Sequence, residues 1–312
     1  MSADFAFIAV DGGGGALRVR SGQVGEANAG SLTERTYPGA TLGEVSLGDY
    51  YCDALTDFIS ASAVKPDRVV LAVGVLPGLP QAREDLLKLI KAATGAKEVW
   101  LTSDSVGAHC ASIKGNGIVI AVGTGVASLA TGRNRTYVHE LSGDSYLIGD
   151  EGGAYWQGKS GLNSALRFKD GRGGSEALLK AALTYYKTTP DYLADLATEV
   201  DRPVHTIAGF APSVSKLAKD GDRHALAIIE KASEELALLA TTALRICGDA
   251  DFEAVITGGA ILEDGLLFHK TSELITAAGI PVRVSERSNL DGVTDFAQWD
   301  NPGVYSPIVH LL

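Results

Sequence analysis

The stretch AVDGGGGALRV, residues 9–19, places four consecutive glycines between two short apolar runs and directly after an aspartate. The flanking residues FAFIAV (5–10) and ALRVR (16–20) have the composition of strands. A flexible linker is also rich in glycine, but strand-like sequence on both sides favours a β-hairpin with a glycine-rich turn. Because glycine has no side chain, the backbone N–H groups of such a turn can approach a phosphate closely.

Strands and helices alternate in the residues that follow this hairpin. RVVLAVG (68–74) and EVWLTSD (98–104) are short apolar runs typical of buried strands. Between the hairpin and the second of these strands, residues 47–63 and 81–95 carry apolar side chains at helical spacing. Gly95 stands where a glycine commonly ends a helix. The order predicts an α/β domain.

The same pattern starts again near residue 117. GIVIAVGTGVASLATG (117–132) repeats the order of strand, glycine-rich turn and strand, and residues 224–248 form a long amphipathic pattern ending in glycine. AVITGG (254–259) and IPVRVSE (280–286) resemble later strands of a second sheet. We therefore expect a duplicated α/β fold with two domains, residues 1–113 and 114–312, and with the two glycine turns facing each other across a cleft.

Composition excludes several classes of function. The chain has 312 residues, of which 38 are acidic and 27 basic, for a net charge of −11. No Lys or Arg cluster is long enough to follow a nucleic-acid backbone or an anionic membrane, so we expect neither partner. The amino-terminal residues lack the pattern of a secretory signal, and no apolar run could span a bilayer. These features predict a cytoplasmic protein.

Cysteines and histidines give no sign of a metal site. The three cysteines, Cys52, Cys110 and Cys247, lie far apart without CxxC or CxxH spacing, and we interpret them as small buried apolar residues. The six histidines do not fall at the close spacings of zinc ligands. The sequence therefore gives no support to a metal-dependent hydrolase.

Five motifs occur in a fixed order along the chain: VDGGGG (10–15), TSDSVGA (102–108), AVGTG (121–125), GDEGGAYWQG (149–158) and ITGGA (256–260). With these motifs the chain resembles the N-acetylglucosamine kinase branch of the BadF/BadG/BcrA/BcrD ATPase family, within the acetate and sugar kinase, Hsc70 and actin superfamily. The resemblance covers nearly the whole chain. It implies two ribonuclease H-like (actin-type ATPase) domains with an interdomain cleft, and ATP with Mg²⁺ as cofactors. The implied reaction transfers the γ-phosphate to the 6-hydroxyl of N-acetylglucosamine or a close relative.

The resemblance also implies roles for four polar residues. Asp104 matches the catalytic aspartate, which would accept the proton of the sugar hydroxyl as that hydroxyl attacks the γ-phosphate; a helix N-cap is the competing explanation. Asp150 matches a residue that binds sugar hydroxyls. The adjacent Glu151 would either bind the sugar or cap the following helix. Asn28 matches an asparagine that reaches the sugar, with an Asx-turn as the alternative.

Glycine turns and one aspartate would bind MgATP. The resemblance implies that Asp11 holds Mg²⁺ through water, as this ion keeps several of its waters. Thr124 would offer a hydroxyl and an amide to the phosphates. For Gly258 and Gly259, the alternative to nucleotide binding is a plain strand-to-helix turn. The cofactor-binding candidates are Gly12, Gly13, Gly14, Gly15, Gly123, Thr124, Gly125, Gly258 and Gly259.

Two departures from the family pattern affect the proposed sites. Gly15 stands where relatives have a threonine, and one hydrogen bond to a charged group is worth about 1.5–3 kcal/mol, or about 10- to 150-fold in rate. Gly143, Asp144 and Ser145, which we also assign to the sugar site, stand where relatives commonly have Gly-Trp-Gly. A carboxylate at Asp144 would favour the ammonium of glucosamine over an acetamido group.

Three further alternatives follow from these observations. The altered loops are compatible with a pseudokinase or sugar sensor that binds ATP and sugar with weak transfer. An electron-transfer ATPase with an iron–sulfur cluster is disfavoured, because no cysteine lies beside either glycine loop. The tail TDFAQWDNPGVYSPIVHLL (294–312) replaces the family's short closing helix and would cap a sheet edge or pack against a second subunit, so a homodimer stays open.

Overall fold

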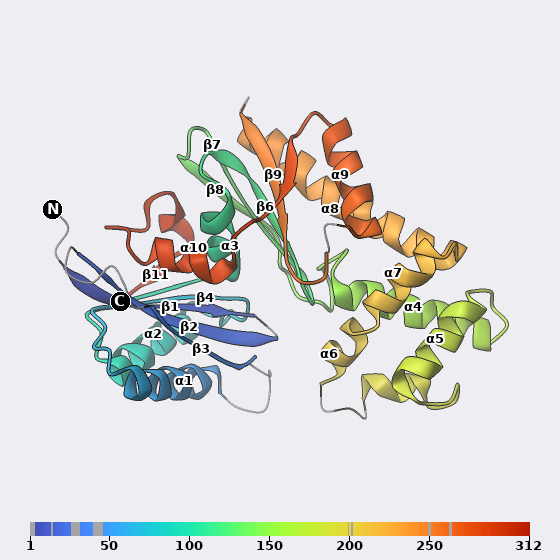
Figure 1. Cartoon of the computed structure of the whole chain (residues 1–312), viewed down its shortest axis with the longest axis horizontal. Helices are drawn as coiled ribbons and strands as arrows, with labels where there is room; N and C mark the ends of the chain where they lie inside the picture. Colours follow the sequence, from blue (N-terminus) through green and yellow to red (C-terminus); the bar gives the residue numbers. More distant parts are fainter. Residues whose placement is uncertain are drawn as a thin grey trace. The chain divides into compact units, whose positions relative to one another are not determined.

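The structure is a computed structural model that describes residues 4–13, 15–25, 32–39, 46–198, 200, 202–248, 251–261 and 264–312. The chain forms two compact units (Figure 1). Unit 1 comprises Met1–Lys114, Arg135–Val138 and Ser285–Leu312, and unit 2 comprises Gly115–Asn134 and His139–Val284.

In its described residues, unit 1 contains a six-stranded sheet in the order β11-β5-β4-β1-β2-β3. The strands are β1 (Phe5–Gly12), β2 (Ala16–Val24), β3 (Thr33–Pro38), β4 (Arg68–Val73), β5 (Glu98–Thr102) and β11 (His310–Leu311). Strands β1, β4 and β5 are parallel, and β1 pairs with β2 in an antiparallel hairpin. The hairpin predicted from residues 5–20 is therefore confirmed.

Helices cover both faces of this sheet (Figure 1). α1 (Leu47–Ser62) and α2 (Pro80–Thr94) lie on one face, and α3 (Asp104–Ser112) and α10 (Asn289–Phe296) lie on the other. Apolar side chains of β1, β4, α1 and α2 form a common core that includes Ile8, Leu55, Phe58, Leu71 and Ile90. Gly95 ends α2 in the left-handed conformation (φ 69°), as its position in the sequence predicts.

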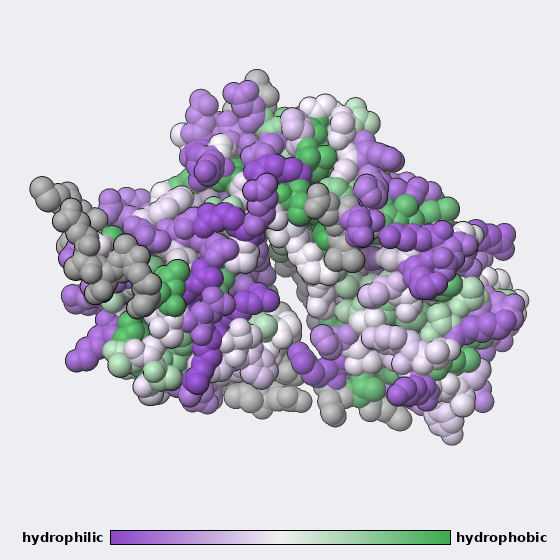
Figure 2. Space-filling view, in the orientation of Figure 1, coloured by the Kyte–Doolittle hydropathy of each residue, from purple (hydrophilic) through white to green (hydrophobic). Residues whose placement is uncertain are grey.

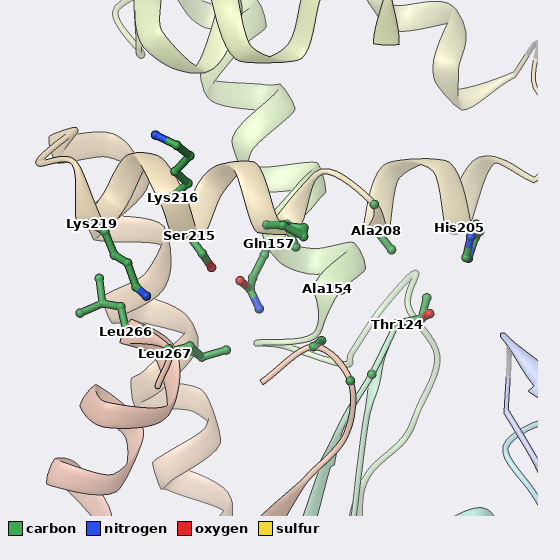
Figure 3. A pocket seen from close by; sticks show the side chains of 17 residues that line it. Thr124, Ala154, Gln157, His205, Ala208, Ser215, Lys216, Lys219, Leu266 and Leu267 are labelled. Atoms are coloured by element: carbon green, nitrogen blue, oxygen red, sulfur yellow. The ribbon is translucent and has the colours of Figure 1, made fainter. Parts of the chain in front are cut away.

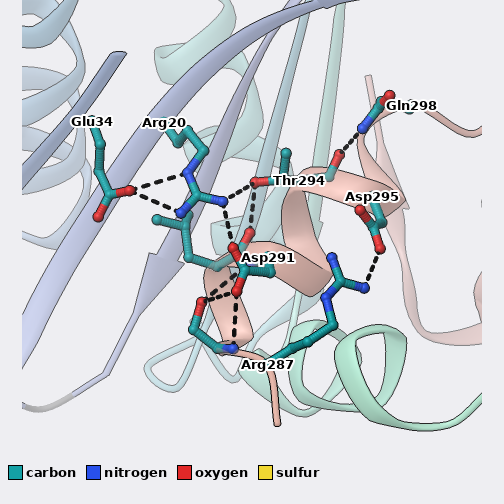
Figure 4. Close-up of polar contacts among 9 residues, drawn as sticks. Arg20, Glu34, Arg287, Asp291, Thr294, Asp295 and Gln298 are labelled. Atoms are coloured by element: carbon teal, nitrogen blue, oxygen red, sulfur yellow. Dashed lines mark hydrogen bonds and ion pairs between the residues drawn. The ribbon is translucent and has the colours of Figure 1, made fainter. Parts of the chain in front are cut away.

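A network of polar contacts fastens α10 to the hairpin (Figure 4). Arg20 on β2 donates to Asp291 (2.7 Å) and to Glu34 on β3 (2.8 Å). Asp291 also closes a capping box with Ser288 at the start of α10. This network holds α10 against the same sheet that carries the first glycine turn.

Unit 2 repeats the strand order of unit 1. Its described residues form a five-stranded sheet in the order β10-β9-β6-β7-β8, in which β6 and β7 are antiparallel and β9 lies parallel to β6. The strands are β6 (Asn116–Val122), β7 (Val126–Gly132), β8 (Tyr137–Ser142), β9 (Phe252–Thr257) and β10 (Val282–Val284). Numbered within each unit, the first five strands of both sheets have the order 3-2-1-4-5, and β11 adds a sixth strand in unit 1, which confirms the predicted duplication.

The helices of unit 2 fall into two groups (Figure 1). α8 (Arg223–Cys247) and α9 (Leu266–Ala277) belong to the sheet, and Gly248 (φ 70°) ends α8 as predicted. A helical insertion lies between β8 and α8. It contains α4 (Ala154–Lys169), α5 (Glu176–Tyr186), α6 (Pro203–Ala208), α7 (Ala211–Lys219) and the 3₁₀ helix η1 (Leu193–Ala197).

The carboxyl-terminal tail lies in unit 1, whereas the predicted domain division assigned all of residues 114–312 to the second domain. Its residues belong to unit 1 because β11 pairs antiparallel with β5, joining His310 to Leu101, and follows the 3₁₀ helix η2 (Gly303–Ile308). The guanidinium of Arg68 donates to the carbonyl of Trp299 (2.6 Å) and anchors the tail. Of the two predicted alternatives, the tail caps a sheet edge of its own chain.

The surface is mixed in polarity. Figure 2 shows hydrophilic residues over most of the visible face, with apolar residues in small separate groups. Within the described ranges, no helix is long and apolar enough to cross a membrane. Cys247 is buried as expected, whereas Cys52 and Cys110 are only partly buried.

Candidate active site

The parallel strands of unit 1 bring Asp104 to the first glycine turn. Asp11, Ala72 and Thr102 lie side by side on β1, β4 and β5, so the residues that follow them meet at one edge of the sheet. The N–H of Gly74 donates to the carbonyl of Gly12 (2.6 Å). A Cβ added to Gly74 would lie 2.9 Å from Oδ2 of Asp104. The carboxylate of Asp104 therefore lies against Gly74, close to the turn.

Asp104 does not occupy the N-cap position that was the alternative explanation for it. Ser103 is the N-cap of α3, and Asp104 is the first residue of the helix. A carboxylate in the first turn is favoured by the helix dipole, which also stabilises its charged form. Asp104 is thus positioned at a helix N-terminus and at the carboxyl edge of a parallel sheet, where α/β proteins bind their ligands.

Asp11 is buried and already paired. Its exposed fraction is 4%, and it accepts a 3.0 Å hydrogen bond from Arg18. Burial raises the pKa of the Asp11 carboxyl above its ordinary value, and the Arg18 guanidinium offsets part of that rise. In the described part of the chain, no group of three or more His, Cys, Asp or Glu side chains could hold a metal ion. Asp11 is paired with Arg18 in this structure, and its expected role in holding Mg²⁺ through water stays a prediction.

The glycines of the first turn differ in whether an added side chain would clash with neighbouring atoms. A Cβ on Gly12 would lie 2.9 Å from side-chain atoms of both Leu17 and Val73, so internal packing accounts for this glycine. At Gly13 and Gly15, a Cβ would meet no described atom within 4 Å. Gly14 and the predicted sugar ligand Asn28 lie outside the described residues.

The second glycine turn is joined to the start of α4 in unit 2. The first helical N–H groups, those of Ala154 and Tyr155, donate to the carbonyls of Gly123 (3.0 Å) and Thr124 (2.9 Å). Gly125 leaves room for the carboxylate of Asp150, because a Cβ there would overlap Oδ2 of Asp150. The predicted phosphate turn and the DEG turn are therefore packed directly against each other.

Asp150 lies close to the negative charges of two other carboxylates, Asp144 and Glu151. Burial raises the pKa of the Asp150 carboxyl, the charges of Asp144 and Glu151 raise it further, and backbone N–H groups of Val126 and Gly143 oppose the rise. Its Oδ1 atom is buried without a hydrogen-bond partner in the described residues. Buried acceptors are normally satisfied, so this atom lacks a donor that a bound hydroxyl could supply.

The loop that precedes the DEG turn has an unusual backbone. Ser142 (φ 61°), Gly143 (φ 88°), Ser145 (φ 100°) and Asp150 (φ 58°) all adopt positive φ, which is sparsely populated by residues other than glycine. The side chain of Asp144 is exposed. Strained backbone of this kind persists only where surrounding contacts enforce it and is concentrated at functional sites.

A pocket of about 580 Å³ opens between the second glycine turn and the helical insertion of unit 2 (Figure 3). Three predicted nucleotide-binding residues line it, namely Gly123, Thr124 and Gly259. Gly125 and Gly258 do not, and both are accounted for by internal contacts: Gly258 has a φ of 112°, and a Cβ on it would overlap the carbonyl of Val122. A Cβ on Gly259 would meet no described atom within 4 Å.

The pocket also contains residues to which the sequence analysis assigned no binding role. One wall is the face of α7 formed by Pro212, Ser215, Lys216 and Lys219, whose spacing of three and four residues is the signal that could have identified it. In Figure 3, Lys219 points into the pocket and Lys216 points away from it, toward its ion-pair partner Asp220. The other lining residues are Ala154, Gln157, His205, Ala208, Gly209, Ala211, Ala260, Gly265, Leu266 and Leu267.

This arrangement suits a ligand with an apolar end and an anionic end. Leu266, Leu267 and Ala208 provide apolar surface, and Lys219 provides a positive charge. The N–H of Gly123 donates to the carbonyl of Gly125 (2.9 Å) within the glycine turn. Gln157 is nearly fully buried, and its amide donates to the carbonyl of Gly152 (2.8 Å), which fixes the wall beside the glycine turn. A nucleotide has this division between an aromatic base and charged phosphates.

Two units whose first five strands have the order 3-2-1-4-5, each with a glycine turn between its first two strands, define the ribonuclease H-like, actin-type ATPase fold. The chain belongs to the BadF/BadG/BcrA/BcrD ATPase family, which it matches over residues 8–292. The last twenty residues, which contain the whole tail (294–312), lie beyond that match.

Solved structures share this fold at low sequence identity. A proposed N-acetylglucosamine kinase from Chromobacterium violaceum is 18% identical, with a TM-score of 0.72 over 94% of this chain and 99% of the other. A proposed N-acetylglucosamine kinase from Porphyromonas gingivalis is 18% identical, with a TM-score of 0.69 over 94% and 98%. A ROK family glucokinase from Streptomyces griseus, in complex with glucose and AMPPNP, is 16% identical, with a TM-score of 0.50 over 94% and 99%. No curated protein matches the chain.

Proposed function

We propose that this protein is an ATP-dependent amino-sugar kinase that transfers the γ-phosphate of ATP to the 6-hydroxyl of N-acetylglucosamine or a close relative. The observation that carries the proposal is the position of Asp104 at the sheet edge, against Gly74 and beside the first glycine turn. Membership of an ATPase family supports ATP as the donor. The names of the structural neighbours support a sugar as the acceptor.

Asp104 would act as the base. As the sugar hydroxyl attacks the γ-phosphorus, its proton passes to the Asp104 carboxylate, the bond from phosphorus to the bridging oxygen breaks, and ADP leaves. Most of the rate enhancement in phosphoryl transfer comes from orientation and charge stabilisation rather than covalent chemistry. The exact placement of the carboxylate therefore matters more than its basicity alone.

The pocket of unit 2 would hold the nucleotide. Its apolar wall at Leu266 and Leu267 suits the base, and the backbone at Thr124 and Gly259 would lie beside the phosphates. Lys219 adds a positive charge that favours an anionic ligand on an otherwise acidic protein. Magnesium, when bound with ATP, would neutralise phosphate charge.

One observation favours glucosamine as a second candidate acceptor. Asp144 and Glu151 raise the pKa of Asp150 through their negative charges, so three carboxylates influence one region. An ammonium group would relieve this repulsion, whereas an acetamido group would not. Glu151 and Asp150 would then bind the acceptor together, with Gly143, Asp144 and Ser145 forming the loop beside it.

ADP release tests the proposal directly. Purified protein with MgATP is assayed against N-acetylglucosamine, glucosamine, N-acetylmannosamine and glucose, with Asp104→Asn as the control. We expect saturable turnover on one amino sugar and its loss in the variant. Binding of ATP and sugar without ADP release would contradict the kinase and support the sensor instead.

A further inference from the structure

We propose that Gly74 is a positioning residue for the base Asp104: its missing side chain creates the space in which the carboxylate is held for proton transfer. This inference rests on the proposed kinase function. Gly74 directly follows β4 and does not belong to either predicted phosphate turn. Its role would be to fix where Asp104 lies, without itself touching substrate.

The need for glycine at this position comes from Asp104 and not from the backbone. A Cβ on Gly74 would lie 2.9 Å from Oδ2 and 3.5 Å from Cγ of Asp104, and its next neighbour would be the Gly12 carbonyl at 3.6 Å. The φ angle of Gly74 lies outside the left-handed region, so an L-residue could adopt this backbone conformation. Alanine would therefore conflict with one side chain, that of the base.

The segment around Gly74 has little freedom to move away from Asp104. The N–H of Gly74 is bonded to Gly12, and the hydroxyl of Tyr51 donates to the carbonyl of Val75 (3.3 Å). Tyr51 is 2% exposed. Burial raises the pKa of Tyr51, and the charges of Tyr50 and Asp104 contribute, which shows that this hydroxyl lies near the base. With the segment held from two sides, an added methyl group would displace the carboxylate.

A displaced base slows proton transfer more than it weakens binding. A misplacement of about 1 Å can cost about 100-fold in rate, because the reacting atoms must be aligned. The added methyl would also exclude water from the carboxylate and raise its pKa. We therefore expect Gly74→Ala to lower kcat about tenfold or more, to leave the affinity for ATP unchanged, and to move the acid limb of the pH profile to higher pH.

Gly78 provides a matched control in the same loop. A Cβ there would meet no described atom within 4 Å, and its φ also lies outside the left-handed region. Gly78→Ala should therefore keep the wild-type kcat, KM values and pH profile. Comparing the two variants distinguishes the general effect of replacing a glycine in this loop from the specific clash of a new Cβ with Asp104.

A double-mutant cycle in stability tests the contact independently of activity. We expect Gly74→Ala to lower the urea midpoint of unfolding in the wild-type background but not in Asp104→Ala, where the conflicting carboxylate is gone. Additive effects on the midpoint would overturn the inference, as would a Gly74→Ala enzyme with wild-type kcat and pH profile. If the wild-type protein turns over no sugar, the kinase proposal fails, and with it this role, even where the cycle shows coupling.

Discussion

Arg18 on β2 lies directly opposite Asp11 on β1, and its guanidinium donates a 3.0 Å hydrogen bond to the Asp11 carboxylate. The side chain of Asp11 is 5% exposed and that of Arg18 is 49% exposed. A buried carboxylate is thus balanced by a cation that still reaches water. The pairing places a positive charge beside the first glycine turn, where phosphates would bind in the proposed reaction.

Replacing Arg18 should destabilise the protein in a pH-dependent way. Burial raises the pKa of Asp11 and Arg18 opposes the rise, so Arg18→Leu raises that pKa further. A raised carboxyl pKa means that the ionised form costs stability above it, and this cost disappears as the pH falls and the group is protonated. We expect a loss of about 1–3 kcal/mol near pH 7 that shrinks towards pH 4.5.

Urea unfolding at both pH values measures this effect, with Arg18→Leu/Asp11→Asn as the control. The double variant has no buried charge at this position, so its loss of stability relative to wild type should depend less on pH. An equal loss at both pH values for the single variant would show that packing of Arg18, rather than its charge, matters.

Restoring the threonine of the family pattern should accelerate turnover. A Cβ at Gly15 meets no described atom within 4 Å, so Gly15→Thr fits without a clash against those residues. A hydroxyl that bonds a phosphate oxygen in the transition state contributes about 1.5–3 kcal/mol, or about 10- to 150-fold in kcat. Steady-state kinetics with Gly15→Ser as a smaller step tests this, and a lowered or unchanged kcat in both variants would contradict it.

Of the two glycines after β9, we expect Gly258 to matter for stability and Gly259 to matter for nucleotide binding. Gly258→Ala forces a non-glycine residue into a φ of 112° and against Val122, and should cost about 1–3 kcal/mol or more in stability. Gly259→Ala has open space on the pocket side and should leave stability within about 0.5 kcal/mol. It should weaken ATP binding about tenfold by crowding the ligand, about 1.4 kcal/mol.

Thermal unfolding and calorimetric titration with ATP measure the two effects on both variants. Gly123→Ala, which also has open space and lines the same pocket, should behave like Gly259→Ala. Unchanged ATP affinity in both pocket variants would argue against this pocket as the nucleotide site.

Asp144 should influence the choice between amino sugars. If its carboxylate pairs with an ammonium at C2, Asp144→Asn lowers kcat/KM for glucosamine relative to N-acetylglucosamine. Since Asp144 is exposed, the change should be modest, about two- to fivefold. Competition assays with both sugars measure the ratio directly, and an unchanged ratio would remove Asp144 from substrate selection.

Strands with clear local patterns were predictable, whereas the edge strands β3 and β11 were not. β1, β4 and β5 are continuous apolar runs, whereas β3 (TERTYP) is charged and almost wholly exposed, as edge strands that avoid aggregation commonly are. β11 has only two residues, and it pairs with β5, which lies far away in the sequence. Local periodicity carries no information about such distant partners.

The sequence by itself determined the duplicated α/β pattern and the glycine turns after the first strand of each unit, because these depend on short-range composition and spacing. Asp104 as the candidate base followed from the resemblance of its motif to a known family. Only the tertiary structure decided which glycines are required by internal contacts, that Asp11 is paired with Arg18, that the tail closes the sheet of unit 1, and that α7 forms a wall of the pocket. These outcomes depend on side chains brought together from distant parts of the chain, where packing and burial, rather than local propensity, set the energy.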